Sequence, residues 1–206
     1  MSATPLTPIR WPAEAIWEAV APGLPGFTVE VLPQIDSTNT ELMRRFRETG
    51  VPEPVLLVAE QQSAGRGRMG RSWQSSWGDS LTFSLGMPLQ PADWSGLSLA
   101  VGISLAESLD PGNPAQPSIR LKWPNDLLIA RAKCAGLLLE GASQGGHFNL
   151  SIGFGINLAT APENAPYPAT SLGTHMGSIG CEHVFTALAN CFAARLSLWH
   201  EGHSHG

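Results

Sequence analysis

One run of residues, from Gly65 to Trp73, restricts the fold more than any other segment. It reads Gly-Arg-Gly-Arg-Met-Gly-Arg-Ser-Trp. This run is poorly suited to a helix or a central strand, and glycine lets the backbone approach a ligand closely. The chain has only 12 Lys and Arg residues, so the arginines here concentrate positive charge that suits phosphate or carboxylate oxygens. We expect a flexible binding loop after a strand over 55–60; a solvated basic loop is the alternative.

Composition limits the classes of function. The chain has 206 residues, 43% of them hydrophobic, which is enough for one substantial core. Its formal net charge of −5 argues against general nucleic-acid binding, so we interpret the arginine-rich run as a local anion site and expect no DNA partner. No signal-peptide profile is present, and no apolar run reaches the ~18 residues of a membrane span. We therefore expect no membrane partner.

The cysteines indicate the redox compartment. Cys134, Cys181 and Cys191 are widely spaced and form no C-x-x-C pair. An odd number of isolated cysteines favours buried, reduced thiols over a disulfide framework or a zinc site. The expected location is therefore the cytoplasm.

Hydrophobic periodicity and turn residues predict an α+β fold. Prolines interrupt residues 1–26, and Thr38 with Glu41 has the spacing of a capping box at the start of a helix. Strands are expected over 27–32 (ending at Pro33), 55–60, 81–86, 118–123, 127–130, 135–140 and 148–158, and helices over 12–20, 36–49, 97–109 and 182–200, with a loop over 159–180. Runs of strands with few helices between them predict a mixed β-sheet with helices packed on one face.

Four further motifs carry chemistry, and each also has a plain structural explanation. Ser37-Thr38-Asn39 suits a helix cap. Lys122-Trp123-Pro124-Asn125-Asp126 has strong turn residues, yet its lysine, amide and carboxylate suit a nucleotide with Mg²⁺. The segment 133–140 places a lysine directly before a buried strand, where a solvated loop charge is the plainer reading. The segment 153–158 has glycines within a strand, which indicates a bulge or close approach to a ligand.

Together with the run from Gly65 to Trp73, these motifs resemble, in order and spacing, the catalytic domain of biotin protein ligases in the biotin/lipoate ligase family. The resemblance covers about residues 27–200 and implies a class II synthetase-like fold. Lipoate ligases share that fold but carry a different glycine-rich motif, so they match less well. The expected organisation is a Pro-rich segment over 1–26, the catalytic domain over 27–200 and a tail over 201–206, with neither an N-terminal helix-turn-helix nor a complete C-terminal β-barrel domain.

The resemblance implies a reaction. Biotin's carboxylate attacks the α-phosphorus of ATP, with Mg²⁺ on the polyphosphate, and gives biotinyl-5′-AMP and pyrophosphate. A lysine of the biotin carboxyl carrier protein of acetyl-CoA carboxylase, or of another biotin-dependent carboxylase, then takes the biotinyl group. Two alternatives stay open: a biotin- or adenylate-binding sensor without ligase activity, and a carrier-interaction module within a larger assembly.

The resemblance also implies roles for individual residues. Lys133 and Arg68 are the catalytic residues, Lys133 bridging the carboxylate and α-phosphate oxygens and Arg68 stabilising developing charge. The biotin-binding residues are Ser37, Thr38, Asn39, Gln62, Gly65, Arg66, Gly67, Arg68 and Lys133. The nucleotide-binding residues are Arg68, Arg71, Trp73, Lys122, Asn125, Asp126 and Asn157, with Asp126 as the metal ligand. A loop closed over the adenylate would keep water from the anhydride.

Overall fold

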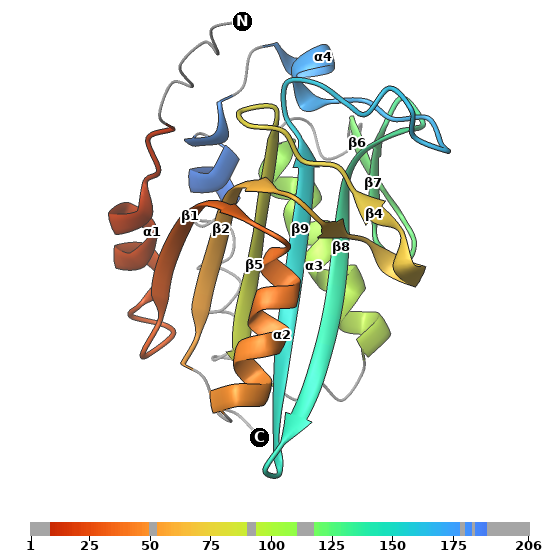
Figure 1. Cartoon of the computed structure of the whole chain (residues 1–206). Coiled ribbons are helices and arrows are strands. Elements are labelled where there is room, and N and C mark those ends of the chain that lie inside the picture. The colour runs from red at the N-terminus through yellow and green to blue at the C-terminus, as the bar shows by residue number, and fades with distance from the viewer. Residues whose placement is uncertain are drawn as a thin grey trace, which may run out of the picture.

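A twisted β-sheet with helices against it forms the body of the molecule (Figure 1). The computed structural model describes residues 9–49, 53–89, 94–110, 118–177, 180–182 and 184–188. The sheet strands are β1 (Thr28–Ile35), β2 (Val55–Gln62), β5 (Ser80–Pro88), β6 (Ile119–Lys122), β7 (Asp126–Ile129), β8 (Ala132–Gln144) and β9 (His147–Asn157). The helices are α1 (Ala13–Val20), α2 (Thr38–Thr49), α3 (Trp94–Leu109) and α4 (Leu172–Met176). A separate ribbon pairs β3 (Gly65–Arg66) with β4 (Ser72–Trp73).

The strand order is β1-β2-β5-β9-β8-β7-β6. The pair β1 and β2 is parallel and is connected through α2, whereas every other neighbouring pair is antiparallel. The expected α+β fold with a mixed sheet is therefore confirmed. The long strands β8 and β9 lie at the centre, where they support the floor of the site described below.

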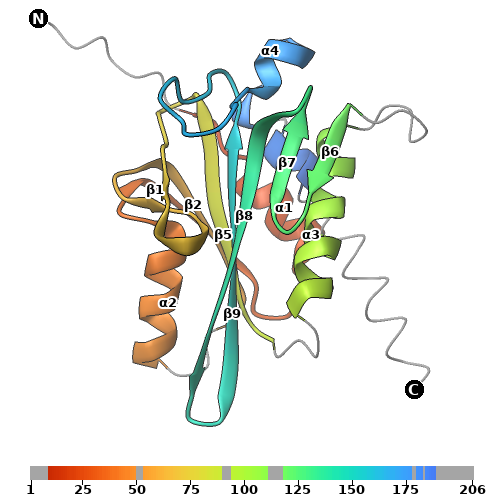
Figure 2. The same cartoon turned by 90° about the vertical axis from the view of Figure 1, so that its right-hand side faces the viewer.

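Helices cover both faces of the sheet, so the expectation that they pack on one face is wrong. In β2, Leu56 and Val58 belong to the larger core, to which α1 and α3 contribute. Val55 and Leu57 belong to a second core formed with α2. Successive strand side chains point to opposite faces, and Figure 2 shows α2 on one side of the sheet with α1 and α3 on the other. The unbroken hydrophobic run in β2 is typical of a strand buried on both faces.

Two local expectations about the ends of elements are wrong. Strand β1 continues through Pro33 to Ile35 because it is an edge strand, where a missing N–H is tolerated. Helix α2 is capped by Ser37, whose Oγ accepts from the Thr40 N–H at 3.4 Å, and not by a box of Thr38 and Glu41.

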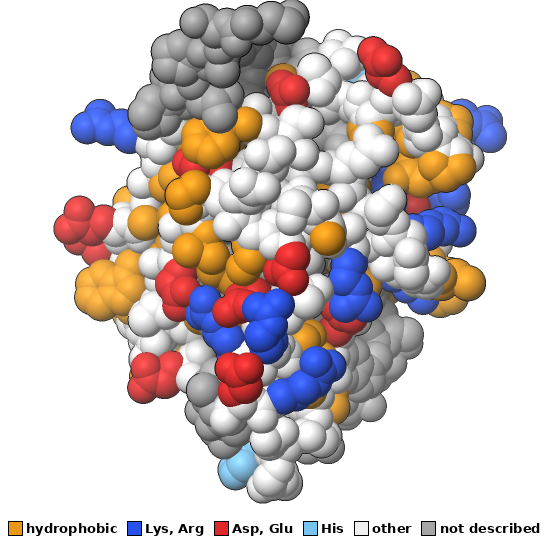
Figure 3. Space-filling view, in the orientation of Figure 1, with side chains coloured by type: hydrophobic (Ala, Val, Ile, Leu, Met, Phe, Trp, Pro, Cys, Tyr) orange, Lys and Arg blue, Asp and Glu red, His pale blue; other side chains and the backbone are white. Residues whose placement is uncertain are grey.

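Glu41 instead takes part in ion pairs on the outer face of α2. It pairs with Arg44 and, at 2.8 Å, with Arg45, which also reaches Glu30 at 2.9 Å. Figure 3 shows these opposite charges interleaved over the helix. The hydrophobic side of α2, with Phe46, is left to pack against the sheet.

The remaining differences lie towards the C-terminus. The short helix α4 interrupts the loop expected over 159–180. Residues 181–182 and 184–188 are helical, and the rest of the helix expected over 182–200 lies outside the described residues. Within the part of the chain that is described, no helix combines the length and apolar character needed to cross a membrane.

The described cysteines are buried, unpaired thiols, as expected. Burial raises the pKa of Cys134 to about 12 and that of Cys181 to about 11, because the thiolate loses its hydration. Both side chains are therefore protonated at neutral pH. Cys191 lies outside the described residues.

Candidate active site

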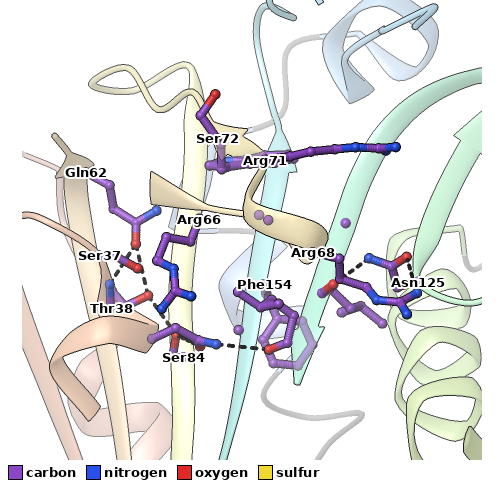
Figure 4. Close-up of a pocket in the computed structure, with 18 of the residues that line it drawn as sticks. Ser37, Thr38, Gln62, Arg66, Arg68, Arg71, Ser72, Ser84, Asn125 and Phe154 are labelled. Carbon is purple, nitrogen blue, oxygen red and sulfur yellow. Dashed lines mark hydrogen bonds between the residues drawn. The ribbon is translucent and has the colours of Figure 1, made fainter. Parts of the chain in front are cut away.

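A pocket opens on the face of the sheet that carries α2. It encloses about 680 Å³ of empty space, a volume that includes its open mouth. Its walls come from the N-terminus of α2, the β3–β4 hairpin and strands β5, β8 and β9 (Figure 4). The lining residues are Ser37, Thr38, Asn39, Gln62, Arg66, Gly67, Arg68, Arg71, Ser72, Trp73, Ser84, Asn125, Asp126, Lys133, Gly136, Leu137, Leu138, Gly153, Phe154, Gly155 and Tyr167.

One end of the pocket is a chain of hydrogen-bonding side chains. Gln62 Oε1 accepts from the Thr38 N–H at 2.7 Å and from its hydroxyl at 3.1 Å. The hydroxyls of Thr38 and Ser84 lie 2.7 Å apart. Ser37 and Thr38 are buried at the first turn of α2, which brings its backbone to the pocket. This end offers donors and acceptors in fixed positions to a polar ligand group.

Asn39 uses all of its hydrogen-bonding capacity inside the protein. Its Oδ1 accepts from Ser84 at 2.7 Å and from Ser151 at 2.9 Å. Its Nδ2 donates to the Leu138 carbonyl at 3.1 Å and to Glu140 at 2.9 Å. Asn39 therefore fixes the strands of the pocket wall to one another and has no free group to offer a ligand.

The glycine- and arginine-rich run forms a hairpin. Gly65 pairs with Trp73, and a turn with positive φ at Met69 and Gly70 reverses the chain. From this hairpin Arg66 reaches toward the side of Ser84, and Arg68 toward Asn125 (Figure 4). The binding loop expected from its composition thus includes two short paired strands that frame the turn.

Each of these two arginines has a partner on the body of the protein. Arg66 Nη2 lies 3.2 Å from Glu140 Oε1, and Arg68 Nη1 donates to Asn125 Oδ1 at 3.4 Å. Asn125 is itself fixed because its Nδ2 donates to the Leu137 carbonyl at 2.7 Å. The hairpin therefore presents its positive charges inward, over the pocket.

Lys133 is a fixed cation in the pocket wall. Its Nζ lies 2.7 Å from Asp126 Oδ1, and it stands 5.8 Å and 5.1 Å from the ring centroids of Trp73 and Tyr167. Only 15% of its side chain is exposed, so it is not the solvated loop charge of the plainer reading. The carboxylate and the two aromatic rings attract the ammonium electrostatically and hold it in place.

The glycines of β9 make room for side chains of the pocket and do not form a bulge. The pairing of β9 with β5 and β8 is regular through Gly153 and Gly155. A Cβ at Gly153 would overlap the Asn39 amide, and one at Gly155 would overlap the Trp73 indole. The absence of side chains on this strand face therefore lets Asn39 and Trp73 lie directly on the sheet.

Three residues predicted for the site do not line the pocket. Asn157 is buried and donates to the Thr170 carbonyl at 3.0 Å. Lys122 is exposed at the end of β6. Gly65 packs between the Trp73 carbonyl and the Gln62 side chain. All the other predicted site residues belong to the lining.

Ser84 and Tyr167 also line the pocket, although they lie outside every motif singled out in the sequence. Ser84 alternates with buried hydrophobic residues in β5 and is itself completely buried, so a hydroxyl at that position was a usable signal. Tyr167 stands in a proline-rich loop without periodicity, where its place beside Lys133 depends on the tertiary fold.

The single carboxylate in the described lining of the pocket suits a metal that arrives with a ligand. Asp126 is the one acidic residue of the described lining, and its Oδ1 contacts Lys133. No cluster of three or more His, Cys, Asp or Glu that could hold a metal occurs among the described residues. Mg²⁺ commonly binds through one or two carboxylates plus substrate phosphates, which fits this arrangement.

Comparison with known proteins identifies the family. The model of the Biotin/lipoate A/B protein ligase family matches residues 31–157, which span the hairpin, Lys133 and most of the sheet. The chain belongs to this family.

Its relatives include biotin ligases. It is 37% identical over 150 residues to the biotin–[acetyl-CoA-carboxylase] ligase of Mycobacterium tuberculosis, covering 70% of this chain and 54% of that protein. Identity to the corresponding ligase of Paracoccus denitrificans is 33% over 176 residues, covering 79% of this chain and 70% of that protein. The chain thus spans about half the length of the first relative.

The fold is shared with a solved biotin protein ligase. The ligase from Aquifex aeolicus in complex with biotin and ATP superposes with a TM-score of 0.66 at 32% identity, covering 82% of this chain and 70% of that one. The mixed sheet with its helices is therefore the fold of the family.

Proposed function

We propose that this protein is an ATP-dependent biotin protein ligase. It forms biotinyl-5′-AMP from biotin and ATP and then transfers biotin to a lysine of the biotin carboxyl carrier protein of acetyl-CoA carboxylase. The observation that carries the proposal is the convergence of Lys133 and Arg68 on a pocket whose other end is a hydrogen-bonding chain. Relatives named for this activity support it.

Activation of biotin needs positive charge because both reactants are anions. A carboxylate oxygen of biotin attacks the α-phosphorus of ATP, the bond from that phosphorus to the bridging oxygen breaks, and pyrophosphate leaves. Lys133 and Arg68 are the preorganised cations that offset the repulsion and stabilise the charge that develops. Lys133 exchanges its contact with Asp126 for ligand oxygens as the reactants enter.

Asp126 then becomes available to a cation. Mg²⁺ bound with the nucleotide neutralises polyphosphate charge, and Asp126 is the residue of the described lining that would hold it. Asn125, Arg71 and Trp73 also belong to the lining. We assign these residues to the nucleotide.

The hydrogen-bonding end is assigned to biotin. A ureido ring carries two N–H donors and a carbonyl acceptor, which match Ser37, Thr38 and Gln62. The dithiolane ring of lipoate carries no such groups, so it would displace water from this polar end without supplying hydrogen bonds in return, which costs binding energy. This argument favours biotin over lipoate.

Transfer completes the reaction. The carrier lysine attacks the carbonyl carbon of the mixed anhydride as a free amine, the bond to the phosphate oxygen breaks, and AMP leaves while the new amide loses a proton. The β3–β4 hairpin, which lies over the pocket, keeps water from the anhydride until then. Reduced, buried thiols support a cytoplasmic location for this chemistry.

The test measures pyrophosphate release with ATP and Mg²⁺ plus biotin, plus lipoate, or with neither acid. We expect release with biotin and background with the other two. If lipoate gave as much pyrophosphate as biotin, or more, the protein would be a lipoate ligase and not a biotin ligase. Biotin binding without any release would favour a sensor or a carrier-interaction module.

A further inference from the structure

Glu140, in strand β8 beneath the hairpin, connects two parts of the site through its two carboxylate oxygens. Its Oε1 lies 3.2 Å from Arg66 Nη2, and its Oε2 accepts from Asn39 Nδ2 at 2.9 Å. The Glu140 side chain is only 22% exposed and is not part of the pocket lining. Glu140 thus lies between the hairpin and the pocket wall, and its side chain does not line the pocket.

The two partners of Glu140 differ in rigidity. Asn39 is buried and is held by three further hydrogen bonds, from Ser84 and Ser151 and to the Leu138 carbonyl. Arg66 is 49% exposed and belongs to a ribbon whose two strands pair with each other and not with the main sheet. The hairpin is anchored to the sheet through Trp73, and Glu140 ties its exposed Arg66 side chain to a second fixed point.

The pairing also divides the hairpin's charges. Glu140 neutralises Arg66, whereas Arg68 contacts the uncharged amide of Asn125 at 3.4 Å, a long distance for a hydrogen bond. Arg68 thus stays available to an anionic ligand, while Arg66 is engaged with the protein. The arrangement separates a residue for holding the hairpin from a residue for the chemistry.

We propose that Glu140 is a positioning residue that latches the hairpin over the pocket through Arg66 and so retains the reactive adenylate until the carrier lysine arrives. The retention part rests on the proposed ligase function. Opening the latch exposes the anhydride to water and to any amine, because nothing else about its reactivity is selective. The residue affects how long the intermediate stays enclosed and not how fast it forms.

The substitution Glu140→Gln cuts the latch selectively. Its amide oxygen can still accept from Asn39, but its NH₂ group then faces the donors of Arg66 and cannot bind them. Glu140→Ala removes both contacts. The matched control is Glu30→Gln. It breaks the 2.9 Å ion pair between Glu30 and Arg45 of α2, in which the Glu30 side chain is 40% exposed.

The first arm measures amide hydrogen exchange over 65–73 without ligand, in the parent, Glu140→Gln, Arg66→Gln, the double variant and the control. We expect each single variant to speed exchange by up to about 5-fold, as suits a partly exposed ion pair. The double variant should add nothing further, because both changes break one interaction. The latch would be overturned if Glu140→Gln exchanged at the parent's rate. It would also be overturned if the double variant accelerated exchange by the product of the two single-variant factors.

The second arm measures retention. Each protein is supplied with biotin, ATP and Mg²⁺, and biotin on added albumin is followed beside the first turnover of pyrophosphate. Glu140→Gln should label albumin faster than the parent and Glu30→Gln while releasing its first pyrophosphate at the parent's rate. Glu140→Ala should in addition raise the KM for biotin, because Asn39 loses an acceptor. Equal albumin labelling in Glu140→Gln and the parent would overturn the retention role.

The two arms separate this proposal from the ligase proposal. Absence of adenylate from the parent itself would refute the ligase activity and, with it, the retention role. The exchange arm needs neither biotin nor ATP, so it still decides whether Glu140 holds the hairpin.

Discussion

At the scale of single residues, Lys133 shows how much tertiary structure adds to a sequence motif. A lysine before a hydrophobic strand has two explanations, and its neighbours in sequence do not choose between them. The fold places its ammonium 2.7 Å from Asp126 and between two aromatic rings that come from distant segments. Those contacts make it a preorganised charge, which is the property that the proposed chemistry requires.

Lys133→Ala is therefore expected to slow pyrophosphate release by about 10²-fold or more, from the worth of one preorganised donor. Biotin affinity should fall much less, because the hydrogen-bonding end is untouched. The exposed Lys122, outside the pocket lining, supplies the control Lys122→Ala. Small and equal losses in binding and release would mean that Lys133 has no special role.

The two inward arginines are expected to fail in different ways. Arg68→Ala should slow formation of the adenylate, because it removes a cation that is free to meet the ligand. Arg66→Gly should still form biotinyl-5′-AMP but release it, which biotin on added albumin would report. An Arg66→Gly protein that makes the adenylate and labels albumin no more than the parent would contradict this division.

Some site residues could be predicted from sequence and others could not, for physical reasons. The Thr38, Gln62 and Asp126 positions follow from motifs at element ends, where side chains face a common edge. Polarity at a strand end does not indicate which way a side chain points: Asn157, at the end of β9, donates to the Thr170 carbonyl and lies outside the pocket lining. Tyr167 reaches Lys133 only through the path of a loop.

At the scale of elements, the sheet strands were predicted because their hydrophobic runs and turns are local signals. The faces of the sheet that the helices cover were not predicted. Strand β2 is buried continuously from Val55 to Glu60, and this pattern implies a covering layer on each face of the sheet. The number of expected helices does not imply such an arrangement. The composition of residues 65–73 predicts a flexible loop, because composition alone does not reveal the pairing of Gly65 with Trp73. Local sequence signals therefore predict where strands and helices occur better than they predict which elements pack or pair together.

The glycines of β9 give a prediction at this scale. Gly155→Ala should displace Trp73 from the sheet, destabilise the protein by about 1–3 kcal/mol as overpacking does, and reduce adenylate formation. Thermal unfolding and pyrophosphate release measure the two effects. Gly23→Ala is the control, because a Cβ there would lie 3.8 Å from its nearest neighbour, the Val20 carbonyl oxygen. Parent-like stability and activity in Gly155→Ala would refute the close packing.

At the scale of the whole molecule, two cores on opposite faces hold the sheet, and the site lies on the face that carries α2. Cys134 lies fully buried in the larger core, and its neutral thiol is favoured there. Since burial raises its pKa from 9.0 to about 12, stability from the neutral thiol is present below pH 9 and is lost as the pH rises toward 12.

This burial predicts the reactivity of the thiol. At pH 8 an alkylating reagent should leave Cys134 unmodified in the native protein and modify it fully after denaturation, because only the exposed thiolate reacts. Peptide mapping by mass spectrometry distinguishes it from the other cysteines. Rapid and complete modification of native Cys134 would show that the larger core is open.

The central claim is that one pocket activates biotin and holds it for a carrier lysine. The most direct measurement adds the components in two stages: biotin, ATP and Mg²⁺ first, then a purified biotin carboxyl carrier domain, with mass spectrometry of all products. We predict pyrophosphate and protein-bound biotinyl-5′-AMP in the first stage, and AMP with a carrier heavier by one biotinyl group in the second. A folded protein that binds biotin yet yields neither pyrophosphate nor adenylate in the first stage would contradict the account.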